Sequence, residues 1–530
     1  MSNHKLNTRA SGVIALAVMC SRVLGLVREV VFSALFGTQW LGIFLVAFRA
    51  PNLLRDLFAE GALSTAFVTV FSKKIESDGP ESAWELARKM MTLATIFMSA
   101  VTLLGIVFAE PLINILAAGF APEFREITVL LTRIMFPFIL LVSLAALAMG
   151  MLNSRNVFGV PAMASSFFNI GSILGGTLIG WWLDPTFGSQ ALIGLAIGTL
   201  IGGLLQFVIQ IPSLRKVGFH FRPDFGWKDP GIRKILILMV PSVIAASAVQ
   251  VNVMVNTSFA TLTDGGPSAV AWLNNAFRLM QLPIGVFGVA VATITLPVVS
   301  RIAASLDRSA FGPTLGKAMR LAVFLTLPAA VGLYFLAEPI ISVIYERGEF
   351  LASDSLQTGL ALQFYAMGLV AYSCIKVLSP AFYAIDRKWT PMLVSFGSIA
   401  LNICLNWLLI FRFGFGHSGL ALSTAVSATL NFAVLYFLMH RFAGTLESRK
   451  FALSVSRCLV AAALLGVVCW SAQTWASHWL NDSTFLIRLT TLLATISVGA
   501  AVYVVACLVL RVESMQDAAN AVRRKLKRSK

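Results

Sequence analysis

The chain has 530 residues, of which 58% are hydrophobic and only 12% charged, and its formal net charge is +17. A soluble protein of this length would carry about twice that share of charged residues. The composition therefore excludes a soluble globular protein and predicts a polytopic integral membrane protein. The first apolar segment begins near Ala10, carries Arg22 and Arg28 and lacks a small-residue cleavage site, so we expect a retained helix and not a signal peptide.

Apolar segments long enough to cross a bilayer core of about 30 Å recur along the whole chain. They predict an all-α protein with fourteen transmembrane helices, at residues 11–36, 41–71, 89–111, 128–152, 157–183, 186–212, 233–262, 267–299, 319–345, 355–384, 391–411, 418–440, 453–476 and 485–510. Most of the 41 lysines and arginines fall in alternate connections, and cytoplasmic connections are the ones enriched in such residues. We therefore expect both termini in the cytoplasm, an N-in and C-in topology.

An internal repeat divides the predicted helices into two groups. Residues 194–207 align without gaps with residues 419–432, and weaker matches join 153–161 to 386–391 and Phe48-Arg49 to Phe277-Arg278. Six predicted helices separate the copies of each match, an even number, so both copies have the same orientation. Parallel repeats of this kind are typical of transporters. The pattern predicts an N-lobe at 1–212, a C-lobe at 213–440, two extra helices within 441–510 and a basic cytoplasmic tail at 511–530.

Charged residues lie near the middle of the first two predicted helices. The arginines among them are Arg22, Arg28, Arg49 and Arg55. An arginine at the centre of a spanning helix costs about 2.5–3.5 kcal/mol, so we expect these side chains to face a wet or protein-lined interior. With Arg278 and Lys376 they outnumber the nearby acids, Glu29, Asp56 and Glu60. A surplus of buried positive charge suits an anionic ligand, and the planar fork of arginine matches phosphate oxygens. The alternative is an ion-pair clamp that holds the first helices together and binds no ligand.

Patterns typical of enzymes are missing from the sequence. The five histidines are scattered without metal-ligand spacing, and there is no Walker motif or glycine-rich loop that opens a helix. The six cysteines lie in apolar segments without CxxC spacing, as expected for packing residues. We predict a transporter with no cofactor and no metal, and not an enzyme. The basic tail is expected to lie on the anionic inner leaflet and not to bind nucleic acid.

Two motifs in the first two helices resemble those of a known family. They are Ser21-Arg22-x-x-Gly25-x-x-Arg28-Glu29 and Pro51-Asn52-Leu53-Leu54-Arg55 leading into Phe58-Ala59-Glu60-Gly61-Ala62. Both are similar to the MurJ (MviN) family of lipid II flippases, part of the multidrug/oligosaccharidyl-lipid/polysaccharide exporter superfamily. Further matches are Leu152-Asn153-Ser154, Phe277-Arg278-Leu279-Met280, Pro380-Ala381-Phe382-Tyr383-Ala384 and Gly419-Leu420-Ala421-Leu422. The resemblance implies a cationic, V-shaped cavity between the lobes. It also implies that the last two helices form a groove for a polyprenyl tail, where the residues alone favour plain packing.

The resemblance assigns roles to individual residues. It implies that the cavity binds the pyrophosphate of the undecaprenyl-linked peptidoglycan precursor through Arg22, Arg28, Arg55 and Arg278. From the charges alone we expect Arg49 to help, with support from Glu29, Asp56, Glu60 and Asn52. The expected partners are this precursor, membrane lipids and cell-wall synthesis proteins, in the bacterial cytoplasmic membrane.

The chain departs from the family pattern where acids are common, at Gly42, Phe277 and Gln281. Gating or cation coupling through those acids is therefore not implied for this chain. Two other interpretations stay open. One is a flippase for another lipid-linked oligosaccharide or a MATE-like exporter, and the other is a membrane polyprenyl-phosphate transferase.

Overall fold

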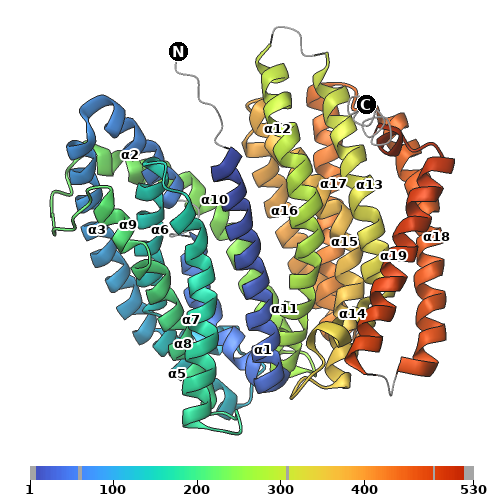
Figure 1. Ribbon diagram of the computed structural model, residues 1–530, viewed down its shortest axis with the longest axis horizontal. Helices are drawn as coiled ribbons and strands as arrows, with labels where there is room; N and C mark the ends of the chain where they lie inside the picture. The colour runs from blue at the N-terminus through green and yellow to red at the C-terminus, as the bar shows by residue number, and fades with distance from the viewer. Residues whose placement is uncertain (1–7, 58–62, 306–308, 481–483, 518–530) are drawn as a thin grey trace. The chain divides into compact units, whose positions relative to one another are not determined.

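The computed structural model describes residues 8–57, 63–305, 309–480 and 484–517 (Figure 1). Every regular element in these ranges is a helix, which confirms the predicted all-α class. Contacts divide the chain into two compact units. Unit 1 is Met1–Ala271 with Gly348–Phe350, and unit 2 is Trp272–Arg347 with Leu351–Lys530.

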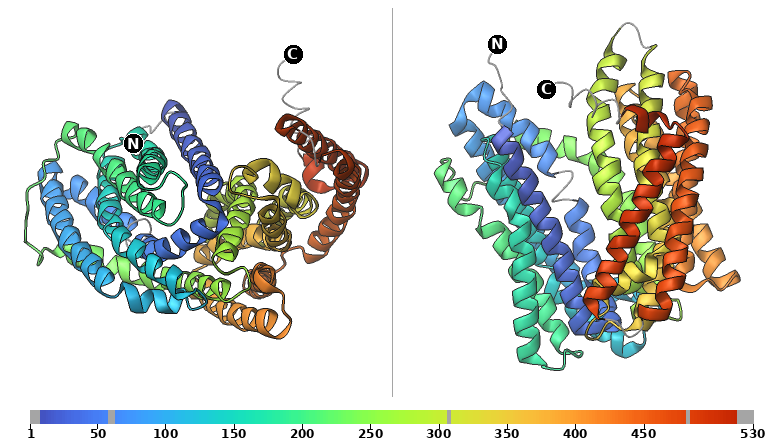
Figure 2. Two further views of the ribbon diagram at one scale, coloured as in Figure 1. Left: turned by 90° about the horizontal axis from the view of Figure 1, so that it is seen from below. Right: turned by 45° about the vertical axis from the view of Figure 1, so that its right-hand side comes forward.

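Unit 1 is a bundle of helices in which α7 and α8 lie side by side (Figures 1 and 2). These two helices approach closely because glycines face each other, and a Cβ on Gly194 would lie 2.3 Å from the backbone nitrogen of Gly180. The helices are α1 Thr8–Leu54, α2 Ser64–Asp78, α3 Pro80–Val107, α4 Ala109–Leu116, α5 Pro122–Met135, α6 Phe138–Ser154, α7 Gly159–Leu183, α8 Ala191–Val208, α9 Ile211–Lys216, α10 Pro230–Thr261 and the start of α11, Gly266–Pro283.

The long helix α1 is broken at Gly37, whose φ of 64° and ψ of 179° are not helical. Only glycine adopts this conformation without strain. The carbonyl of Ala34, which the break removes from the helical ladder, accepts a hydrogen bond of 2.8 Å from the backbone N–H of Glu349. The span Leu16–Leu57 has 42 residues and would be about 60 Å long if it were straight. Because a bilayer core is about 30 Å thick, α1 comprises two legs that meet at Gly37.

The predicted helix at 41–71 crosses residues 58–62, which lie outside the described residues, so its continuity stays a prediction. Its first part is the second leg of α1, which ends at Leu54 and passes into a π turn at 55–57, and α2 begins only at Ser64. Pro51, within this leg, has no N–H to donate to the carbonyl of Ala47. The hydroxyl of Thr132 on α5 donates to that carbonyl instead, over 3.2 Å. The proline is thus accommodated in α1, and the regular ladder ends shortly after it.

Unit 2 is a second bundle, in which α18 and α19 lie side by side and α18 packs along α13 (Figures 1 and 2). The hydroxyl of Tyr503 on α19 donates to the carbonyl of Phe324 on α13 over 2.9 Å. Cys458, Cys469 and Cys507 are free thiols buried in this core. The remaining elements are η2 Ile284–Gly288, α12 Val289–Ala304, α13 Phe311–Phe335, α14 Ala337–Tyr345, α15 Ala352–Ala384, α16 Trp389–Trp407, η3 Leu408–Arg412, α17 Gly416–Ala443, α18 Ser448–Leu480 and α19 Phe485–Val509.

The number of spans differs from the prediction. Twelve helices of the described residues are long and apolar enough to cross a membrane, or up to 13 when the bent pair Pro230–Ile244 and Val249–Thr261 counts as one span. The predicted count of fourteen is therefore not confirmed. The span Leu16–Leu57 is counted once although it contains the Gly37 break. The predicted helix at 319–345 is also divided, because α13 ends at Phe335 and α14 begins at Ala337.

Helix α10 packs with unit 1, although it was predicted as the first helix of the C-lobe. Its N-cap Asp229 accepts hydrogen bonds from the Gly231 N–H at 2.7 Å and from Lys89 of α3 at 3.1 Å. Burial alone would raise the pKa of Asp229, but the bond from Gly231 and the contacts with Lys89 and Lys74 lower it below its usual value. These contacts anchor the start of α10 to α2 and α3.

The predicted lobes 1–212 and 213–440 are defined by an internal repeat, whereas units 1 and 2 are defined by contacts. The lobes therefore stay a prediction. The short helices α4 and α14 add a match that the sequence reasoning missed. Each begins with Ala-Glu-Pro, at Ala109–Pro111 and at Ala337–Pro339. This correspondence favours the repeat.

Candidate substrate site

The first leg of α1 carries three of the predicted site residues. Arg22 is exposed, and Arg28 and Glu29 are half-buried. The guanidinium carbon of Arg28 lies 5.2 Å from the centre of the Phe168 ring on α7, a cation–π contact. The neighbouring Asn169 donates to the carbonyl of Ser21 over 3.2 Å, which fixes α7 against α1. The structure therefore holds Arg28 on an aromatic face.

An aromatic series connects this contact to the second leg of α1. Phe44 stacks on Phe48 with ring centres 6.0 Å apart, Phe48 lies 5.2 Å from Phe138, and Phe138 lies 5.6 Å from Phe168. The sequence reasoning missed this series, because phenylalanines on three different helices give no local pattern. Arg49 and Asn52, on the same leg, are half-buried.

Arg55 and Asp56 form an ion pair of 2.8 Å at the end of the second leg. Their side chains are 23% and 30% exposed, so the pair contributes modestly to stability. The other oxygen of Asp56 accepts a hydrogen bond of 3.0 Å from Gln250 of α10. Sequence reasoning expected internal pairing between the first two helices and missed Gln250. The only signal was an amide in the middle of an apolar segment.

The other predicted residues lie elsewhere. Arg278 is half-buried on α11 in unit 2, where the adjacent Phe277 packs edge-on against Tyr365 at 5.3 Å. Glu60 lies outside the described residues. Lys376, which the sequence analysis counted among the intramembrane cations, is exposed on α15. Of the predicted site residues that the structure describes, unit 1 contains Arg22, Arg28, Glu29, Arg49, Asn52, Arg55 and Asp56. Their union with Arg278 in one cavity stays a prediction.

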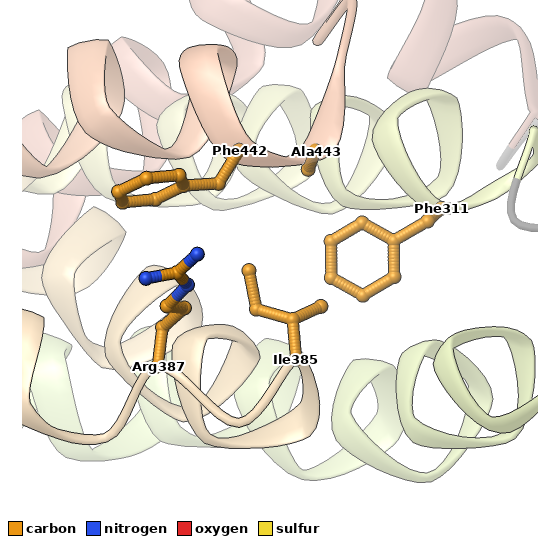
Figure 3. A pocket seen from close by; sticks show the side chains of 5 residues that line it. All are labelled: Phe311, Ile385, Arg387, Phe442 and Ala443. Atoms are coloured by element: carbon orange, nitrogen blue, oxygen red, sulfur yellow. The ribbon is translucent and has the colours of Figure 1, made fainter.

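Two cavities lie away from these residues. One of about 240 Å³ lies at the end of unit 2 where α15 and α17 finish, between Phe311, Ile385 and Phe442. There the Arg387 guanidinium lies under the Phe442 ring, 4.8 Å from its centre (Figure 3). A second cavity, of about 420 Å³, has an almost wholly apolar lining from α3 and α10. Within the described part of the chain no cluster of His, Cys, Asp or Glu could hold a metal ion.

Comparison with known sequences gives a consistent result. The family model described as "Lipid II flippase MurJ" matches residues 32–491. A protein of Vibrio cholerae named "Probable lipid II flippase MurJ" is 37% identical over 516 residues, which cover 95% of this chain and 96% of that protein. A protein of Burkholderia cenocepacia named "Lipid II flippase MurJ" is 34% identical over 464 residues, or 86% of this chain and 88% of its own length.

Solved structures agree with the sequence relatives. The structure titled "Lipid II flippase MurJ, inward closed conformation" has a TM-score of 0.72 and 28% identity, and covers 92% of this chain and 98% of its own. An inward-facing multidrug MATE transporter of the MOP superfamily has a TM-score of 0.68 at 15% identity, covers 82% of this chain and 98% of its own, and shows a shared fold alone. With the family match spanning most of the sequence, this chain belongs to the MurJ family of lipid II flippases.

Proposed function

We propose that this chain is an alternating-access flippase that moves lipid II, the undecaprenyl-pyrophosphate-linked peptidoglycan precursor, from the inner to the outer leaflet of the bacterial cytoplasmic membrane. The observation that carries the proposal is 37% identity over 95% of the chain to a protein named as a lipid II flippase. The N-in and C-in topology, and association with cell-wall synthesis proteins, belong to the same proposal.

The arginines of α1 bind the pyrophosphate in this proposal. Arg28 is held on Phe168, and the ring fixes the guanidinium so that less side-chain entropy is lost when an anion binds. Arg55, whose guanidinium contacts Asp56, supplies a second planar fork for the phosphate oxygens. Arg22, Arg49 and Arg278 complete the anion site, and Glu29, Asn52, Asp56 and Glu60 orient it.

Depletion and complementation in the native bacterium test the proposal. Depletion of the chain should leave lipid-linked precursor on the inner leaflet, as measured with a leaflet-resolved probe. Wild type should restore export, Arg28→Ala should not, and Arg28→Lys should restore it in part, since lysine keeps the charge but loses the planar fork. Arg215→Ala, at an exposed site on α9, is the matched control. Normal export after depletion would overturn the proposal and point to another lipid-linked substrate. Full activity of Arg28→Ala would overturn the role of Arg28 alone.

A further inference from the structure

A cavity of about 500 Å³ in unit 2 lies between α14, the start of α15 and the helices α18 and α19. None of the residues that line it takes part in the proposed pyrophosphate site. Its polar lining comes from Glu338, Ser342, Glu346, Gln473, Arg488, Thr491 and Thr495. Apolar side chains, among them Leu336, Val343 and Leu492, form the rest of the wall.

An ion pair forms one wall of the cavity. Nη1 of Arg488 lies 2.9 Å from a carboxylate oxygen of Glu346 and 3.3 Å from the Ser342 hydroxyl. The Ser355 hydroxyl donates to the other Glu346 oxygen over 2.7 Å. Burial alone would raise the pKa of Glu346, but the bonds from Ser355, Ser342 and Arg488 lower it below its usual value. Glu346 is therefore ionised and neutralises Arg488, whose Nε and Nη2 protons remain for a ligand.

Glu338 gives the cavity a net negative charge. It lies in the first turn of α14, is exposed, and has no ion-pair partner among the described residues. Arg347 is close in sequence but does not line the cavity. Its guanidinium donates to the carbonyls of Val343 and Ile344 and lies over the Phe485 ring. With Glu338 and Glu346 against Arg488, the cavity favours a ligand that carries a cation and disfavours a pyrophosphate lipid.

Exposed aromatic residues near the cavity indicate a position at the level of lipid headgroups. Trp475 on α18 is 72% exposed and lies two residues beyond Gln473. Phe485, the first residue of α19, is 52% exposed. Tryptophan is enriched where the hydrocarbon core meets the headgroups. A cavity at this depth, with polar groups on one wall and apolar groups on another, matches a lipid that has a polar head and a hydrocarbon tail.

We propose that this cavity binds a phospholipid with a phosphoethanolamine headgroup. The ammonium group donates hydrogen bonds to Glu338, and the phosphate accepts them from Arg488, Gln473 and Thr491. The start of an acyl chain lies against the apolar wall formed by Leu336 and Leu492. A primary ammonium has three N–H donors, whereas a choline headgroup has none and a glycerol headgroup has no cation. The site is therefore selective for the amine.

Native mass spectrometry of the purified full-length protein in detergent tests the proposal. The protein is mixed with equal amounts of phosphatidylethanolamine, phosphatidylcholine and phosphatidylglycerol that have identical acyl chains. Wild type should retain the ethanolamine lipid about fivefold more than either competitor, and Glu338→Gln should reduce it to the level of the choline lipid. Glu110→Gln is the matched control, because Glu110 is exposed in the same Ala-Glu-Pro motif at the start of α4.

Three results would overturn the proposal. Equal retention of the three lipids by wild type would overturn the proposal, and so would an unchanged ethanolamine preference in Glu338→Gln. An equal loss in Glu110→Gln would also overturn it, because the effect would then not belong to this cavity. None of these outcomes depends on whether the protein moves lipid II.

Discussion

Replacement of Arg320 should destabilise unit 2, because this side chain holds the C-terminal segment to α13. Arg320 is only 3% exposed. Its Nη2 lies 3.0 Å from Glu447, which precedes α18, and its Nε lies 3.0 Å from Glu513, which follows α19. Rupture of a fully buried pair costs about 3–5 kcal/mol. The two carboxylates are 21% and 44% exposed and are rehydrated when the arginine is removed, so we expect Arg320→Met to cost about 2 kcal/mol.

A thiol-reactive fluorophore measures this loss during heating of the purified protein in detergent. Cys20 and Cys404 are exposed and react at once, whereas Cys374, Cys458 and Cys507 are buried in unit 2 and react only when it unfolds. A loss of 2 kcal/mol should lower the midpoint by about 4–8 °C. Lys317→Met is the control, because its pair with Asp517 on the same surface is 60% and 48% exposed and should contribute little. Equal midpoints for Arg320→Met and wild type, or equal shifts in both variants, would refute the reasoning.

Three further predictions concern other contacts. Thr132→Val should lower the unfolding midpoint by about 2–4 °C, since it leaves the Ala47 carbonyl beside Pro51 without its hydrogen bond; an unchanged midpoint would contradict this role. Phe168→Leu should reduce the affinity for inorganic pyrophosphate, measured by calorimetry, about two- to fivefold by loss of the contact with Arg28, whereas Phe187→Leu, whose ring packs against Phe36, should leave it unchanged. Glu346 has a folded pKa below its ordinary value of 4.5, so its ionised form stabilises the fold above that value, and this stability disappears as the pH falls through the folded pKa. Midpoints measured between pH 6 and pH 3 should therefore decline less in Glu346→Gln than in wild type, and parallel curves would contradict the prediction.

The sequence predicted the helices well where apolar runs are long and flanked by charge. The segments 157–183 and 485–510 correspond closely to α7 Gly159–Leu183 and α19 Phe485–Val509. It did not predict the change from α-helix to a π turn at 55–57, because hydrophobicity does not record the hydrogen-bond pattern of a helix. It also could not assign α10, since the contacts of Asp229 with Lys89 and Lys74 join segments far apart in the chain.

The charged residues of the candidate site could be selected from the sequence, whereas the residues that contact them could not. An arginine within an apolar helix is costly in lipid, so Arg28 and Arg55 could be identified from the sequence alone. Phe168 and Gln250, which position Arg28 and Asp56, are ordinary residues of apolar segments. Their roles arise only from packing against α1. The same is true of Glu338 and Arg488, which the sequence places about 150 residues apart and the fold brings to one cavity.

The charges on α1 bear on how the membrane potential would act on the proposed transport. Arg22, Arg28, Arg49 and Arg55 against Glu29 and Asp56 give a formal charge of about +2 in unit 1. A pyrophosphate lipid with about two negative charges would make the loaded group nearly neutral, so the loaded step would move little charge across the membrane. The empty group would then return inward as a cation, down an inside-negative potential, with a gain of about 2.3 kcal/mol per charge per 100 mV. Over a whole cycle the protein charges return to their starting place, so the substrate charge alone sets the total work. In the proposed mechanism the arginines would place this work in the return of the empty carrier.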